Sequence, residues 1–188
     1  MLKTKLIIPI AVTLSVLPDI DLLFPFIQHR GPTHSIISAL VVFAPFFVAY
    51  RKQAVPYFVA LVQHSLVGDY IAGGRVQLLW PLTRMYFGTS LDIRSPTNVA
   101  LEWIMFLTAM IVMLGLKDAR TLFQAHKSNL VLAIPTLTVL LPTMLSFPMQ
   151  VPTLLIPPHV IYTIMFTAAI LIEVPATLKV VKNRLAKR

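Results

Sequence analysis

Six long apolar stretches limit what this sequence can fold into. They lie near residues 4–17, 34–50, 54–71, 98–116, 129–147 and 154–175. Only 12% of the residues are charged, and a soluble domain of 188 residues would need a larger polar surface. A helix of about 20 apolar residues crosses the hydrocarbon core of a bilayer. The sequence therefore predicts an all-α membrane protein, a bundle of about six transmembrane helices that forms one domain over residues 1–188.

The first apolar stretch allows two interpretations. Lys3 and Lys5 precede it, as in a signal peptide, but no Ala-x-Ala-like cleavage site follows Leu17. We therefore expect a retained helix that stops at Pro18.

The basic residues divide unevenly between the two ends of the predicted helices. With the N-terminus in the cytoplasm, the outer side holds only four of the sixteen Lys and Arg residues: Arg30, Arg75, Arg84 and Arg94. The positive-inside rule then predicts that both termini are cytoplasmic and that the protein lies in the cell membrane. The same assignment places five of the seven acidic residues and most of the histidines on the outer, extracytoplasmic side.

The formal net charge of +9 does not indicate a nucleic-acid partner. The basic residues lie mainly in short loops and at the C-terminus, where they orient the chain and meet anionic lipid headgroups. No zinc-finger or RNA-binding signature accompanies them. The sequence has no cysteine, which excludes disulfides, thiolate metal sites and cysteine nucleophiles.

Two aspartates follow the first apolar stretch in the segment Pro18-Asp19-Ile20-Asp21. In an extended chain their carboxylates would point to the same side. Two carboxylates at such a short distance repel each other unless a cation or a proton lies between them. Asp19 and Asp21 are thus candidate metal ligands, and the ordinary alternative is a helix end with solvated acids.

Two histidines flank the turn Arg30-Gly31-Pro32. Thr33 is a good N-cap residue, so we expect the second span to start there, with His34 in its first turn. The positive end of the helix dipole would keep the His34 imidazole neutral and able to bind a metal. Free N–H groups at this helix start could also bind phosphate. The alternative is that His29 and Arg30 are ordinary interfacial groups.

A histidine and an aspartate, His64 and Asp69, lie near the outer end of the third span. In an ideal helix five residues turn by about 500°, so the two side chains would be about 140° apart. For both side chains to reach the same site, the helix must contain a π-bulge, loosen at Gly68, or fray at Asp69. The alternative is a polar pair that helps helices to pack.

Other polar residues on the predicted outer side are weaker candidates. Arg75, in the long loop 72–97, could join Arg30 in binding phosphate or lipid headgroups. Glu102 and His159 could be metal ligands or partners of ligands, or could form hydrogen bonds within the bundle.

These motifs, followed by a glycine-containing loop and Leu79-Trp80-Pro81, resemble the YdjM-like family of membrane-bound metal-dependent hydrolases over roughly residues 15–82. The resemblance implies six metal-binding residues: Asp19, Asp21, His29, His34, His64 and Asp69. The family is distantly similar to zinc-dependent phospholipase C and related nucleases, which implies phosphoester chemistry. Many members have three residues between the His and Asp of the third span, whereas this chain has four.

The motifs predict that the three polar segments meet around a divalent metal, most readily Zn²⁺, on the outer side. We expect hydrolysis of a phosphoester in a lipid or lipid-linked substrate by metal-activated water, with the functional residues between about 15 and 97. Asp21 or Asp69 would be the general base, and Arg30 and Arg75 would stabilise the developing negative charge. Two alternatives remain open: an ion- or proton-coupled transporter, and a membrane protein whose metal site is only structural.

Overall fold

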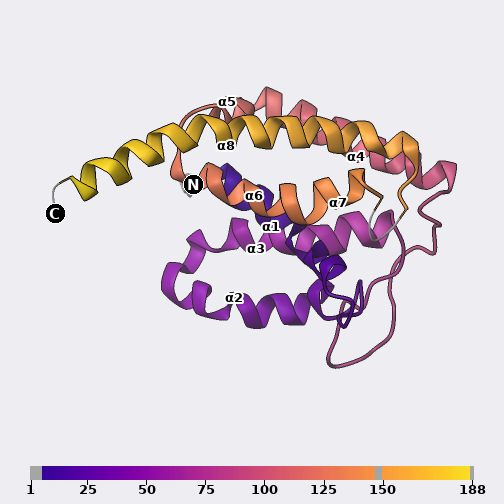
Figure 1. Ribbon diagram of the computed structural model, residues 1–188. Coiled ribbons are helices and arrows are strands. Elements are labelled where there is room, and N and C mark those ends of the chain that lie inside the picture. The colour runs from indigo at the N-terminus through magenta and orange to yellow at the C-terminus, as the bar shows by residue number, and fades with distance from the viewer. Residues whose placement is uncertain (1–5, 147–149, 187–188) are drawn as a thin grey trace.

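The computed structural model describes residues 6–146 and 150–186, and helices joined by loops make up its architecture (Figure 1). The α-helices are α1 (Ile8–Val16), α2 (Ile36–Tyr50), α3 (Val55–Gln63), α4 (Pro96–Gly115), α5 (Asp118–Leu122), α6 (Ala133–Pro135), α7 (Leu141–Met144) and α8 (Ile156–Leu185). Short 3₁₀ or π segments are η1 (Leu17–Leu23), η2 (Pro32–His34), η3 (Arg51–Gln53), η4 (His64–Asp69), η5 (Lys127–Leu132), η6 (Thr136–Leu140) and η7 (Thr153–Leu155). Within the described ranges the β-structure is one isolated bridge, between Val76 and Phe87.

Four helical segments are long and apolar enough to cross a membrane. They are Ile36–Gln53, Pro96–Gly115, Lys127–Met144 and Thr153–Val180. These match four of the predicted spans and confirm an all-α membrane protein. The other two predicted spans, 4–17 and 54–71, correspond to the shorter helices α1 and α3. A bundle of about six spans therefore stays a prediction.

The helices lie in layers around α1 (Figure 1). α1 packs against α3 on one side and against η5 on the other, and η5 packs against α8. α8 and α4 form one outer face of the molecule, and α2 lies at the opposite face (Figure 1). The N-terminal helices that carry the polar motifs are thus held together by direct contacts.

A small apolar core fixes α2 against α3. Ala39 and Phe43 of α2 are buried with Leu61 of α3. Helices that share such a core resist sliding past each other, because interiors are close-packed. The start of α2 and the end of α3 are therefore held at one end of the molecule, together with the end of α1.

The second predicted span begins later than expected. The cap of α2 is Ser35, whose hydroxyl oxygen accepts hydrogen bonds from the backbone N–H groups of Ile37 and Ser38 at 3.1 and 3.3 Å. The expected cap, Thr33, is wrong, because Pro32–His34 forms a 3₁₀ turn before the helix. His34 therefore lies before the helix, and not in its first turn as predicted.

The long loop after α3 holds this 3₁₀ turn in place. Gln77 N–H donates to Arg30 O at 2.9 Å, and Ile36 N–H donates to Leu78 O at 3.0 Å. Gln77 and Leu78 are buried. The loop is thus hydrogen-bonded to the backbone just before and just after the turn that carries His34.

Candidate metal centre

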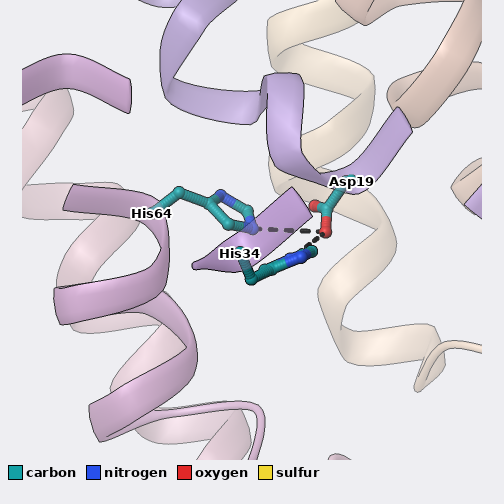
Figure 2. Close-up of side chains that lie close together, drawn as sticks. All are labelled: Asp19, His34 and His64. Atoms are coloured by element: carbon teal, nitrogen blue, oxygen red, sulfur yellow. Dashed lines mark ion pairs between the residues drawn. The ribbon is translucent and has the colours of Figure 1, made fainter. Parts of the chain in front are cut away.

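Three polar side chains from separate segments meet at the ends of α1, α2 and α3 (Figure 2). Asp19 lies in η1, His34 in η2 and His64 at the start of η4. Asp19 Oδ1 is 3.3 Å from His34 Nε2 and 3.2 Å from His64 Nε2 (Figure 2). One possible ligand atom from each residue lies within 4.8 Å of the other two. The expected meeting of the three sequence motifs is confirmed.

Asp69 completes this group from the end of η4. Its Oδ2 is 3.3 Å from His34 Nε2 and 3.6 Å from His64 Nε2. The Nε2 atom of each ring therefore faces one oxygen of Asp19 and one oxygen of Asp69. Asp19, His34, His64 and Asp69 are called the candidate metal centre below.

The two imidazole rings are turned in the way that metal-binding histidines are usually turned. His64 Nδ1 is 3.0 Å from the backbone oxygen of Ser15, and His34 Nδ1 is 2.9 Å from Thr33 Oγ1. With Nδ1–H donating to these oxygens, the lone pair of each Nε2 faces the carboxylates. An oxygen acceptor at the other ring nitrogen fixes this tautomer and orientation.

Asp21 and His29 form a second group on the far side of the His34 ring. Asp21 Oδ1 is 2.8 Å from His29 Nδ1, and its Oδ2 is 3.3 Å from His34 Nδ1. The Thr33 hydroxyl also donates to Asp21 Oδ2 at 2.6 Å. Asp21 is 2% exposed, so these contacts fix the His34 ring from behind. Asp21, His29 and His34 also have ligand atoms within 4.8 Å of one another.

The side chains of the candidate metal centre fit a divalent cation. In a tetrahedral zinc site with bonds of 2.0–2.1 Å, neighbouring ligand atoms are about 3.3–3.4 Å apart. The four carboxylate–imidazole separations here are 3.2 to 3.6 Å. Two of the atoms, His34 Nε2 and Asp69 Oδ2, are buried and make no hydrogen bond within the described residues. Buried polar atoms that converge without bonding to each other are what a shared cation would satisfy.

The charges of the site favour a bound cation. Burial alone would lower the pKa of His34, but the neighbouring carboxylates of Asp19, Asp21 and Asp69 raise it to about 9. Burial would raise the pKa of Asp19, but His64 and His34 bring it well below its usual range. The expectation of a neutral His34 is therefore wrong for the protein alone, since three carboxylates surround the ring. A metal ion would compete with this proton for the same nitrogen.

A π turn brings His64 and Asp69 onto the same side of their helix. Within η4 the backbone N–H of Tyr70 donates to Ser65 O, five residues earlier. This wider turn accommodates one extra residue compared with an α-helix. It confirms the π-bulge among the three predicted possibilities, and it absorbs the extra residue between His64 and Asp69.

Arg30 contacts Asp69 and the backbone of the long loop. Its Nε is 3.1 Å from Asp69 Oδ1, and Nη1 donates to the carbonyl oxygen of Gly73. A Cβ added to Gly74 would lie 2.5 Å from Arg30 Nη1, and the φ of Gly74 is +123°. A glycine pair at 73 and 74 thus leaves the space that the guanidinium occupies.

Three candidates from the sequence lie outside these contacts. Arg75 is exposed, and Glu102 and His159 are half-buried on α4 and α8. His159 Nδ1 is 2.7 Å from the backbone oxygen of Leu155, the residue just before α8. Within the described part of the chain, no hydrogen bond or ion pair joins any of the three to the candidate metal centre.

Two positioning residues were missed in the sequence. Asn98 is fully buried, and its Oδ1 accepts from the Gly73 N–H at 2.6 Å, which holds the loop that contacts Arg30. The second is Thr33, which is expected from the sequence to cap a helix, whereas its hydroxyl donates to Asp21 Oδ2. Only the asparagine had a signal, as a polar residue near the start of an apolar span.

The fold and the site define a helical membrane protein with a candidate metal centre of two histidines and two aspartates. The model of the YdjM inner membrane protein family matches residues 2–149 of the chain. The protein therefore belongs to this family, as the motifs indicated. No curated protein and no solved structure matches it.

Proposed function

We propose that this protein is a membrane-bound, metal-dependent hydrolase that cleaves a phosphoester bond in a lipid or lipid-linked substrate. The observation that carries this proposal is the arrangement of His34 and His64. Both rings direct Nε2 toward Asp19 and Asp69, while Nδ1 is held by an oxygen behind the ring. A set of two imidazoles and two carboxylates suits Zn²⁺ best among common divalent metals.

The residues of the candidate metal centre would hold the ion, and Asp21 would orient His34. When bound, a divalent metal lowers the pKa of water toward neutral and polarises a phosphoryl oxygen. Asp69 is placed to act as ligand or general base, because Oδ1 contacts Arg30 and Oδ2 has no hydrogen bond within the described residues. Arg30 would support the reaction through Asp69. Arg75, which is exposed in the loop 72–97, would bind a phosphoryl group.

The first test is elemental analysis of the purified protein, followed by a panel of phospholipids and lipid phosphates. We expect near-stoichiometric zinc and metal-dependent release of phosphate or headgroup. Asp19→Asn and His64→Ala should lose the metal. Asp92→Asn and His126→Ala are matched controls, because both residues are exposed outside the centre. A metal-free protein of unchanged stability would rule out both an enzyme and a structural metal site.

The two alternatives give different results in the same material. A structural site predicts bound zinc and stability that depends on it, without hydrolysis of any substrate in the panel. A transporter predicts zinc- or proton-coupled flux in liposomes. Hydrolysis that Asp19→Asn abolishes and His126→Ala leaves intact supports the enzyme.

We also propose that the candidate metal centre lies on the extracytoplasmic side. The positive-inside rule supports this side, and the sequence has no cysteine to interfere with labelling. Thr83→Cys, in the loop 72–97, should react with a membrane-impermeant maleimide in whole cells. Lys52→Cys, in η3, should react only after the membrane is opened. The reverse pattern would place the site in the cytoplasm.

A further inference from the structure

An apolar cavity lies between α1, α2 and α3, beside the candidate metal centre. Its volume of about 770 Å³ is in the usual range for sites that hold a small organic ligand. Its walls include Ile10 and Leu14 of α1, Val42 and Phe46 of α2, and Leu61 of α3. None of the described residues that line it carries a charge. The cavity therefore suits a hydrocarbon ligand.

One end of this cavity adjoins the candidate metal centre. Leu17 lines the cavity two residues before Asp19, and Leu61 lines it three residues before His64. Because α1 continues into η1 and α3 into η4, these apolar side chains lie about one turn from the metal-binding atoms. A ligand could therefore contact the cavity and the centre at once.

The other end lies at the turn between α2 and α3. Tyr50 and Gln53 line it there. Nearby, the backbone N–H of Ile7 donates to the hydroxyl of Tyr57 at 3.0 Å, which ties the start of α1 to α3. From Leu6 to Leu17 the lining spans twelve residues of mostly helical chain, a rise of about 16 Å. The cavity is thus long and runs along the helix axes.

We infer that this cavity binds the hydrocarbon chain of an amphiphilic phosphoester whose phosphate lies at the candidate metal centre. This inference rests on the proposed function and specifies its substrate as a chain-bearing phosphate. Among the described lining residues only Tyr50, Gln53 and Tyr57 carry polar side chains, so most of the wall offers a soluble phosphoester no polar partner. An amphiphile suits both the candidate metal centre and the cavity, because its phosphate would lie at the centre and its hydrocarbon chain would lie along the helices.

The direction of the cavity agrees with how a lipid lies in a bilayer. A lipid keeps its headgroup at the interface and its chain in the hydrocarbon core. α2 belongs to a segment long and apolar enough to cross a membrane, and the polar turn η2 directly precedes it. A substrate could therefore enter the cavity sideways from the bilayer without inverting its headgroup.

Photo-crosslinking with two forms of dodecyl phosphate tests this inference. One form carries a diazirine next to the phosphate and the other carries it at the terminal carbon. The probes are added to the zinc-loaded full-length protein in phosphatidylcholine nanodiscs. We expect the first probe to label residues around Leu17 and Leu61, and the second to label residues around Tyr50 and Tyr57. The same sites for both probes, or labelling mainly on the exposed faces of α4 and α8, would overturn the inference.

Two neighbouring valines provide a matched pair of variants. Both side chains are largely exposed, Val42 at 60% and Val41 at 70%, but only Val42 lines the cavity. Val42→Trp should reduce labelling inside the cavity roughly tenfold, because the larger indole would take up space that the hydrocarbon chain needs. Val41→Trp should leave the labelling unchanged. The zinc content of both variants reports whether the fold is kept, and equal labelling in folded variants would contradict the inference.

The proposed binding of a hydrocarbon chain in the cavity (the chain site) and the proposed function can fail separately. Oriented labelling without hydrolysis of any phosphoester would keep the chain site and reject the enzyme. Hydrolysis of water-soluble phosphoesters by the wild type, together with labelling that has no orientation, would reject the chain site alone. Dodecyltrimethylammonium with a terminal diazirine is the headgroup control, and oriented labelling by this cation would also overturn the inference.

Discussion

Arg30 Nε lies 3.1 Å from Asp69 Oδ1, which leaves Asp69 Oδ2 facing the imidazole nitrogens of His34 and His64. Arg30 has a positive φ of 61° and precedes the turn that carries His34. One side chain thus links the His34 segment to the aspartate at the end of η4. The orientation of Asp69 depends on this contact and on the glycines that make room for it.

We expect Gly74→Ala to disturb the candidate metal centre through Arg30. The added methyl group would clash with the guanidinium, and the φ of +123° strains any other residue. The cost should be about 1–3 kcal/mol of stability, with weaker zinc binding, measured by thermal unfolding and elemental analysis. Gly115→Ala is the control, because a Cβ there meets nothing within 4 Å. Equal zinc binding in the two variants would show that the contact is dispensable.

Asp21→Asn and Asp19→Asn should differ in severity. Asp21 contacts His34 Nδ1, and Asp19 contacts both Nε2 atoms. Removing a partner that orients a ligand typically costs about 10–100-fold in metal affinity, whereas removing a ligand should abolish tight binding. Competition with a chromophoric chelator measures both. If the two variants lose the metal equally, Asp21 is itself a ligand, as the family resemblance implies.

Deleting Val67 should be tolerated. It lies in the π turn and is 42% exposed. Its removal would restore α-helical spacing and leave three residues between His64 and the aspartate, an i, i+4 spacing at which the two side chains share a face. Zinc content should remain near the wild-type value. Deletion of Val59, an exposed residue of the regular helix α3, should abolish binding, because it rotates one part of the helix by about 100° against the other.

The stability of the metal-free protein should fall as the pH rises toward 9. The pKa of His34 is raised from 6.5 to about 9 by Asp19 and Asp21, against the effect of burial. A raised pKa stabilises the fold fully below about 6.5, and this contribution is lost as the pH passes through 9. Thermal unfolding in chelator across this range measures the loss. His34→Gln should reduce the pH dependence, and a wild-type profile that stays flat would contradict the pKa shift.

Zinc should reduce this dependence, since bound metal replaces the proton on His34. Zinc binding should also weaken at acid pH, because protons compete for the same nitrogen and oxygen atoms. Titration of zinc at pH 6 and pH 8 checks the direction. Equal affinity at both values would indicate that the imidazoles are not ligands.

Much of the fold could be predicted from local pattern. The apolar stretches that became α2, α4, α8 and the segment Lys127–Met144 are long and continuous, so hydropathy identifies them without tertiary information. Helix starts were less accurate. Thr33 and Ser35 are both good cap residues, and the choice between them depends on the loop contact between Ile36 and Leu78. That partner lies more than forty positions away.

The motifs alone identify the chemical groups that lie together at one end of this helical membrane protein. Aspartate and histidine in an apolar chain are costly unless they are paired, so they can be recognised without coordinates. Which ring nitrogen faces which carboxylate follows from the folded structure and not from the motifs. The fold placed Asp21 behind His34, paired Arg30 with Asp69, and formed the π turn that aligns His64 with Asp69. These outcomes depend on side-chain rotation and on contacts between distant segments, which spacing along the chain does not encode.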